Sequence, residues 1–207
     1  MDMGGLERPQ SPRGAVSSMP VRTRQWTRLE YERLIDRGVF REDERLELLN
    51  GLLVVTEPQG NSHAVAVDLV AAALRSSFGE GWLVRVHAPV ALGRRSRPEP
   101  DVAVVRGSPR DYLAEAPTDP VLVIEISQTS LALDRARKAS VYARAGIADY
   151  WIVNLVEGVV EIHRDPVALD PARARRVYRS VHALGRGASL SPLAVPGASI
   201  PVADLLP

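Results

Sequence analysis

Acidic side chains interrupt two apolar runs that have the composition of buried strands. Glu125 lies inside "VLVIEIS", and Asp101 opens "DVAVV". Because successive side chains of a strand point to opposite faces, Glu125 shares a face with Val123 and Ser127. A buried carboxylate loses its hydration at large cost unless a cation meets it. The two runs therefore predict either ion pairs with arginine or a metal site, and for Asp101, which follows Pro100, also a turn.

Glu47 adds a third carboxylate on an apolar face. The Asn-Gly pair at residues 50–51 suits a two-residue type I′ turn, and the resulting hairpin places Glu47 opposite Val54. Carboxylate oxygens are hard ligands of the kind that Mg²⁺ and Mn²⁺ prefer. We therefore expect Glu47, Asp101 and Glu125 to converge within reach of one ion.

A single lysine follows these acids. Of the 26 Lys and Arg residues, Lys138 alone is a lysine. A helix over residues 135–145, capped by Asp134, would place Lys138 on one stripe with Val141 and Tyr142, facing the sheet. A compact ammonium suits a position beside an attacking water or a phosphate oxygen better than a planar guanidinium does. The alternatives are a snorkelling side chain and an ion pair with Asp134 at the i+4 spacing.

The elements that must position these residues alternate between helices and strands. We expect helices over residues 26–38, 61–79 and 135–145, a hairpin around residues 50–51, and strands over residues 82–92, 101–107, 121–127, 149–154, 159–164 and 175–181. This order predicts an α/β domain with a mixed sheet. Residues 1–20, rich in Gly, Pro and Ser, are expected to form a disordered leader, and residues 21–207 a single domain.

Composition excludes several classes of protein. The chain has no cysteine, so it has no disulfide framework, no thiolate metal site and no cysteine nucleophile. It contains no apolar run of the length that spans a bilayer and no secretory signal, so we expect a cytoplasmic protein without membrane contact. The net charge of +1 argues against strong nonspecific binding of nucleic acid, although local arginine clusters still allow a phosphate contact.

The order of the site residues resembles the PD-(D/E)XK nuclease superfamily. The "PD" is Pro100-Asp101, and Glu125 follows in a buried strand. Ser127 stands where the usual lysine would be, and Lys138 on the following helix fits the arrangement of branches in which the lysine has migrated. The stretch "VIEISQTSLALDRARKASVYARAGIADYWIVN" is similar to the Uma-two family of restriction-endonuclease-like proteins. The segments "ELLNG" and "SPLAVPGASIPVADLL" also fit, so the resemblance covers roughly residues 25–207.

The resemblance implies a restriction-endonuclease-like fold, with a central mixed β-sheet flanked by helices, and metal-dependent cleavage of nucleic acid, with DNA the expected substrate. Asp101 and Glu125 would hold Mg²⁺ or Mn²⁺ with the backbone carbonyl of Ile126, and Glu47 would complete the shell through water. Lys138 would orient the attacking water or neutralise charge that develops on the phosphate. The family also makes a homodimer a possible assembly.

Contacts to the substrate are predicted at His63, Gln128 and Arg97, although a packing role for His63 and a solvated role for Arg97 fit the sequence equally well. Two other functions remain open. One is a nuclease fold that binds DNA or protein without catalysis, and the other is a structural protein whose buried acids are all paired with arginine. Metal binding and cleavage separate these functions. We also expect Asp101→Ala to abolish metal binding and to leave the fold at least as stable, because it removes one of several mutually repelling acids.

Overall fold

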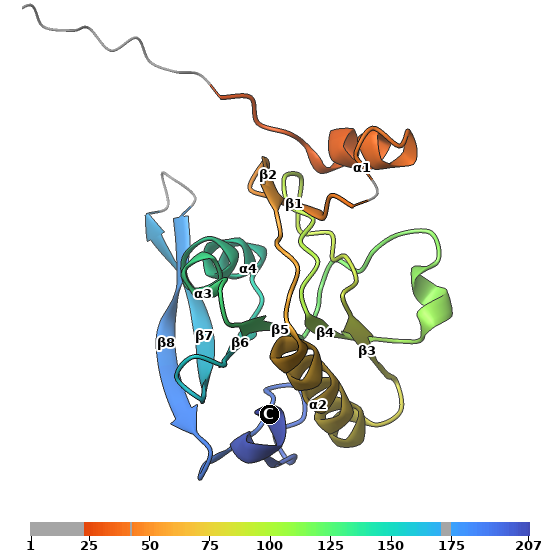
Figure 1. The fold of residues 1–207 in the computed structure, drawn as a ribbon. Coiled ribbons are helices and arrows are strands. Elements are labelled where there is room, and N and C mark those ends of the chain that lie inside the picture. The colour runs from red at the N-terminus through yellow and green to blue at the C-terminus, as the bar shows by residue number, and fades with distance from the viewer. Residues whose placement is uncertain (1–22, 42, 171–174) are drawn as a thin grey trace, which may run out of the picture.

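A six-stranded mixed sheet, in the order β3-β4-β5-β6-β7-β8, forms the centre of the protein (Figure 1). The structure is a computed structural model that describes residues 23–41, 43–170 and 175–207, so the expected leader over residues 1–20 lies outside the described residues. The strands are β3 (Trp82–Val86), β4 (Val102–Arg106), β5 (Leu122–Ser127), β6 (Asp149–Asn154), β7 (Val159–Asp170) and β8 (Arg175–Gly185). Neighbours β5 and β6 run parallel, and the other neighbouring pairs run antiparallel. The predicted α/β fold with a mixed sheet is confirmed.

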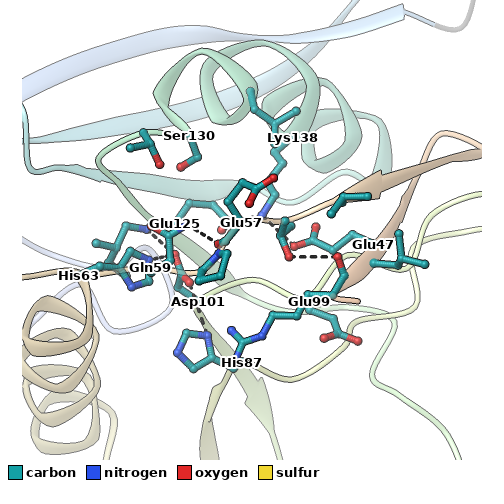
Figure 2. A pocket seen from close by; sticks show the side chains of 18 of the residues that line it. Glu47, Glu57, Gln59, His63, His87, Glu99, Asp101, Glu125, Ser130 and Lys138 are labelled. Atoms are coloured by element: carbon teal, nitrogen blue, oxygen red, sulfur yellow. Dashed lines mark hydrogen bonds and ion pairs between the residues drawn. The ribbon is translucent and has the colours of Figure 1, made fainter. Parts of the chain in front are cut away.

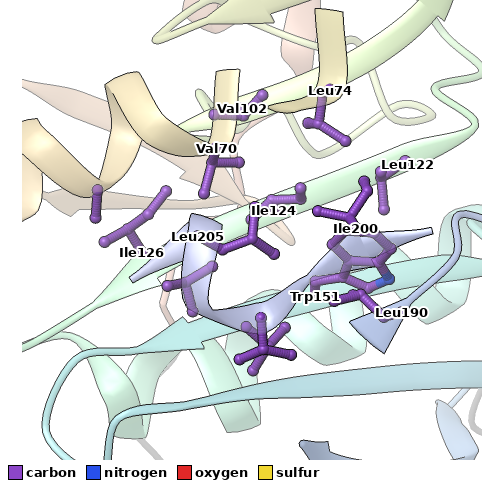
Figure 3. Packing of buried hydrophobic residues seen from close by; sticks show 14 of the residues in the cluster. Val70, Leu74, Val102, Leu122, Ile124, Ile126, Trp151, Leu190, Ile200 and Leu205 are labelled. Carbon is purple, nitrogen blue, oxygen red and sulfur yellow. The ribbon is translucent and has the colours of Figure 1, made fainter. Parts of the chain in front are cut away.

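One face of this sheet packs against an apolar layer. Helix α2 (Asn61–Phe78) covers it together with the C-terminal segment, which contains β9 (Ser189–Leu190), β10 (Ile200–Pro201) and the 3-10 helix η4 (Val202–Leu205). Leu122, Ile124 and Ile126 of β5 point into this layer and meet Val70 of α2 (Figure 3). Trp151 of β6 is fully buried in the same layer. This face therefore supplies the larger part of the apolar core.

The opposite face carries the second helical layer. A continuous helical segment connects the parallel strands β5 and β6, as a parallel connection requires. It consists of α3 (Leu131–Leu133), the π-helix η2 (Asp134–Lys138) and α4 (Ala139–Ala145). The hairpin of β1 (Leu46–Leu49) and β2 (Leu52–Val55) lies beside it, since Leu49 shares a buried cluster with Val123, Val141 and Tyr142.

Local signals in the sequence explain several of these elements. Helix α1 (Arg28–Asp36) begins with a capping box between Thr27 and Glu30, and Gly38 follows its end with φ 60°. Residues 50–51 have φ 52° and 83°, the left-handed pair that a type I′ turn needs, and the predicted pairing of Glu47 with Val54 is confirmed. Gly79 ends α2 as predicted.

Three predicted boundaries are wrong. The predicted strand over residues 82–92 ends at Val86, because His87 takes a left-handed backbone conformation with φ 45°. The last two strands are longer than the predicted ranges 159–164 and 175–181 because they pair with each other as a long antiparallel ribbon. The described residues include no helix that is both long and apolar enough to cross a membrane.

The helical segment after β5 differs most from the prediction. It begins at Leu131 rather than after Asp134, so Asp134 lies within the helical segment and is not its cap. The side chain of Asp134 instead accepts hydrogen bonds of 2.6 Å from the hydroxyls of Ser127 and Ser130. Gly146 ends the segment with φ 81°, as predicted. The π-helical turn from Asp134 to Lys138 therefore faces the sheet with both of its buried charged residues.

Candidate active site

A cavity of about 830 Å³ lies beside the C-terminal half of β5, between the β1-β2 hairpin and the helical segment. Figure 2 shows that acidic, basic and imidazole side chains point into it. Of the residues predicted from the sequence, Glu47, Asp101, Glu125, Ile126, Lys138 and His63 line this cavity. The structure thus brings together residues from β1, α2, β5 and the π-helix with Asp101, which directly precedes β4.

Lys138 lies at the centre of the charged cluster and is only 5% exposed. Its ammonium nitrogen donates to Glu125 Oε2 at 3.0 Å and to Glu47 Oε1 at 3.2 Å. Burial disfavours its charged form, but the attraction of Glu125 and Glu47 outweighs burial, and the pKa of Lys138 rises above its usual value. Lys138 is therefore a buried cation held between two carboxylates, and the alternative of a simple pair with Asp134 is not what the structure has.

Glu125 is the most enclosed acid of the cluster, at 2% exposed. Besides Lys138, it accepts a hydrogen bond of 2.5 Å from the hydroxyl of Tyr142. Burial raises the pKa of Glu125 well above its usual value, and the charge of Lys138 offsets only part of this rise. The pKa of Glu47 is raised for the same reason, and among the described residues its buried Oε2 has no hydrogen-bond partner. The cluster therefore has more buried acid than one lysine neutralises.

Asp101 is held in place from three sides. Its Oδ2 accepts a hydrogen bond of 2.7 Å from the backbone N–H of Ile126 and lies 3.1 Å from Nε2 of His63. Its Oδ1 lies 3.5 Å from Nδ1 of His87. Asp101 thus directly precedes β4, and its side chain connects this position to α2 and to β5, so it does more than form a turn.

Behind the cavity, the π-helical turn adds a third buried acid to Glu47 and Glu125. Asp134 is 1% exposed, and burial raises its pKa above the usual value. Its Oδ2 accepts hydrogen bonds from Ser127 and Ser130, while its Oδ1 has no hydrogen-bond partner in the part of the chain that the structure describes. Ser127, which stands at the usual lysine position of the superfamily motif, therefore anchors the helical turn that carries Lys138.

Two predicted substrate contacts lie elsewhere. Gln128 is exposed and does not line the cavity. Arg97 bonds to Glu99 at 3.2 Å, lies 3.6 Å from Glu32 and packs over the ring of Tyr31. Arg97 is thus engaged in holding α1 to the loop before β4, because the tertiary fold adds Glu32 of α1 to its sequence neighbour Glu99.

The structure adds site residues that the sequence analysis missed. His87 and Glu99 line the cavity near Asp101, and Gln59 lines it from the loop before α2 (Figure 2). The only signal for Glu99 was its place in "PEPD", two residues before Asp101, and residues two apart in an extended chain point to the same side. Nothing in the sequence indicated His87 as a site residue, because it lies in a run that is typical of a strand and takes a left-handed backbone conformation there.

The donor set fits a hard divalent cation. Carboxylate oxygens predominate, and the unpartnered Oε2 of Glu47 is a buried acceptor without a donor. In the present arrangement, the ammonium of Lys138 lies between two of the acids. Among the described residues there is accordingly no preformed group of three His, Asp or Glu side chains able to hold an ion. Glu47, Asp101 and Glu125 therefore line one cavity, as expected, but they do not form a complete set of metal ligands.

Comparisons with known proteins agree with this fold. A solved structure titled as a putative nuclease belonging to DUF820, from Anabaena variabilis ATCC 29413, superimposes with a TM-score of 0.61. The two chains are 15% identical, and the match covers 83% of this chain and 96% of the other. A search of curated proteins finds no match. The mixed α/β architecture is therefore shared with the protein that is titled as a putative nuclease.

The family is also defined by sequence. Residues 28–203 match the model of the Uma2 family, which is described as "Putative restriction endonuclease". Because the match covers most of the chain, the protein belongs to the Uma2 family, as its resemblance predicted.

Proposed function

We propose that this protein is a metal-dependent endonuclease that hydrolyses phosphodiester bonds of nucleic acid, with DNA as its substrate. The observation that carries the proposal is Lys138, the single lysine, held between Glu125 and Glu47 in the cavity that Asp101 also lines. A buried cation among more acids than it can neutralise suits a site that binds a second cation. Membership of the Uma2 family supports the same class of reaction.

Asp101 and Glu125 would hold Mg²⁺ or Mn²⁺, with the carbonyl of Ile126 and with Glu47 as further oxygen donors. When bound, the ion neutralises charge on the scissile phosphate and lowers the pKa of the attacking water. The protein's own contribution is to fix its ligands. The N–H of Ile126 orients Asp101, and the hydroxyl of Tyr142 orients Glu125.

Lys138 would supply the positive charge that the transition state needs. Its raised pKa keeps the side chain protonated at neutral pH, so it donates hydrogen bonds and does not act as a base. With Glu125 engaged as a metal ligand, the ammonium of Lys138 would be free to orient the attacking water or to donate a hydrogen bond to a phosphate oxygen. His87, whose side chain is 52% exposed at the edge of the cavity, is placed to meet the incoming substrate.

The second candidate is a nuclease fold that binds DNA or protein without cleaving it. Glu47 Oε2, a buried acceptor without a donor among the described residues, favours a site that takes up a further cation, and cleavage separates the enzyme from the binding module. A cytoplasmic location and a homodimer stay predictions.

Calorimetric titration of Mn²⁺ into the wild type and Asp101→Asn tests the proposal. Asparagine keeps an oxygen that can accept from the N–H of Ile126, so the variant removes charge and preserves the hydrogen bond. We expect binding by the wild type, little or none by the variant, and metal-dependent cleavage of single-stranded, duplex or branched DNA by the wild type alone. Equal metal affinity in the two proteins would contradict the ligand assignment. Metal binding without cleavage of any substrate would favour the binding module.

A further inference from the structure

A second cavity, of about 420 Å³, lies beside the turn of the β1-β2 hairpin and the C-terminal end of α4. Arg94 and Arg95 approach it from the loop before β4, and Arg144 approaches it from α4. No acidic side chain lines this cavity within the described part of the chain. Its walls therefore carry positive charge alone, in contrast to the acidic cavity described above.

The three arginines have no partner within residues 23–41, 43–170 and 175–207. Each is exposed, and none of their guanidinium groups makes an ion pair or a side-chain hydrogen bond there. Arg97, two residues from Arg95, is by contrast committed to Glu99. Unpaired guanidinium groups around one hollow offer forked donors whose geometry matches phosphate oxygens.

The backbone beneath Arg94 and Arg95 is fixed. The carbonyl of Arg94 accepts a hydrogen bond of 2.8 Å from the N–H of Arg28, and the carbonyl of Arg95 accepts one of 2.7 Å from the N–H of Gly51. The hydroxyl of Ser96 accepts a further bond of 3.0 Å from the N–H of Asn50. The loop is therefore fastened to both α1 and the hairpin turn, which preorganises the arginines for a ligand.

Two elements run from the acidic cavity to this basic one. Lys138 and Arg144 lie six positions apart along the helical segment, a separation of about 9 Å at 1.5 Å per residue. Glu47 of β1 and Asn50, the first residue of the hairpin turn, lie three positions apart, a separation of about 10 Å in an extended chain. Phosphates of one duplex strand rise about 3.4 Å per nucleotide along the axis and also wind around it, so neighbouring phosphates lie farther apart than this rise and the spacing corresponds to about one or two nucleotides.

We propose that Arg94, Arg95 and Arg144 form a phosphate-binding subsite that holds the nucleic-acid backbone about one or two nucleotides from the bond that is cut. The inference rests on the proposed function. It implies that the nucleic acid runs from the acidic cavity to the basic one, across the surface formed by α4 and the β1-β2 hairpin. The subsite carries affinity without base recognition, because guanidinium contacts to phosphates are independent of sequence.

The test is a comparison of two triple variants. Arg94→Ala/Arg95→Ala/Arg144→Ala removes the subsite, and Arg33→Ala/Arg37→Ala/Arg110→Ala removes the same charge from exposed arginines that line neither cavity. Binding of labelled duplex DNA is measured in chelator over a range of salt concentrations. We expect the slope of log affinity against log salt to fall by about two to three for the subsite variant, since each lost phosphate contact contributes about 0.9, and to change little for the control.

Cleavage under saturating and limiting DNA completes the test. The subsite variant should retain the wild-type kcat and show a raised KM for long DNA. With a dinucleotide, whose single phosphate cannot occupy both cavities, the variant and the wild type should have the same KM. A wild-type salt slope in the subsite variant, with wild-type binding intact, overturns the subsite and leaves the nuclease proposal standing. A wild type that binds no DNA overturns both proposals. Competition by poly-glutamate equal to that by DNA assigns the cavity to an acidic peptide and overturns the phosphate assignment.

Discussion

The two faces of the central sheet have opposite chemistry although they share the same strands. On the α2 face, β5 contributes Leu122, Ile124 and Ile126 to an apolar layer. On the face covered by the helical segment, the same strand contributes Glu125 and Ser127, both buried. Side chains alternate along a strand, so six consecutive residues serve two unlike environments.

The two faces are expected to serve different purposes, the α2 face stability and the helical face the chemistry of the site. The α2 face is filled mainly by apolar side chains. Its buried carboxylate, Asp149, accepts hydrogen bonds from the indole N–H of Trp151, from Arg164 and from the N–H of Leu193, and so holds the C-terminal cover in place. The helical face contains buried charges that persist only because Lys138 and two serine hydroxyls offset them. We therefore expect substitutions on the first face to change folding and substitutions on the second to change metal binding and cleavage.

The largest effect should come from the apolar face. Leu74→Ala removes a fully buried side chain of α2 and should lower the free energy of unfolding by about 2 to 5 kcal/mol. Urea denaturation measures this, with Val65→Ala as the control, because Val65 lies on the same helix and is 48% exposed. Mn²⁺ affinity should stay unchanged in both variants while they are folded. A Leu74→Ala protein with normal stability and lost metal binding would reverse the assignment of the two faces.

On the helical face, Lys138→Arg should slow cleavage at least about a hundredfold and leave the fold intact. The charge is preserved, but the planar guanidinium cannot occupy the position of a compact ammonium among Glu47, Glu125 and the substrate. Single-turnover cleavage with Mn²⁺ is the measurement. Arg137→Lys, an exchange at an exposed position of the same helical turn, is the matched control and should cleave at the wild-type rate. Equal rates for wild type and Lys138→Arg would show that arginine serves as well as lysine.

Asp101 connects the two faces, and its removal should affect stability as well as metal binding. The sequence alone predicts that Asp101→Ala is at least as stable as the wild type. The structure gives a reason for the opposite result, because the N–H of Ile126 would lose its acceptor, at a cost of about 1 to 3 kcal/mol. Asp101→Asn should lose much less, and thermal unfolding of the two metal-free variants makes the comparison. Equal melting temperatures for Asp101→Ala and the wild type would mean that repulsion among the acids outweighs this hydrogen bond.

The smallest expected effect is on the pH dependence of folding stability. Burial lowers the pKa of His163 on the helical face, although the nearby Glu161 raises it in part. The unfolded chain then binds a proton at a higher pH than the folded one does. The stability that neutral His163 gives the fold is therefore complete above about pH 6.5 and is lost as the pH falls through the lowered pKa. Phenylalanine keeps the ring contacts with Tyr150 and Tyr178. His163→Phe should thus weaken the loss of stability between pH 7.5 and pH 5, measured by urea denaturation, and an unchanged profile would contradict this assignment.

What the sequence predicted follows from local rules. The faces of β5 follow from a period of two, the pairing of Glu47 with Val54 follows from an Asn-Gly turn, and the inward direction of Lys138 follows from helical spacing. Each of these inferences needs only residues within one element or one turn. For this reason four of the cavity's acidic and basic side chains could be named before the structure was known.

What the sequence did not predict depends on contacts between elements. The π-helical turn exists where Asp134 meets Ser127, seven residues earlier on a strand, and helical periodicity does not anticipate this meeting. Arg97 looked available because its partner Glu32 lies on α1. His87 reaches Asp101 through a backbone conformation that a strand-like sequence hides. In each case a tertiary contact overrides the local pattern.

The cover of the apolar face has a consequence for how the protein forms in a cell. Residues 190–206 complete the layer over Ile124 and Trp151, and η4 packs against α2, whose sequence is much earlier. Synthesis proceeds from the N-terminus, so α2 and all six strands of the sheet leave the ribosome before this segment does. Until the segment docks, a broad apolar surface stays open to other chains, and closing so long a loop is slow. We therefore expect the yield of folded protein to be limited by this late docking step, a kinetic property that equilibrium stability does not reveal.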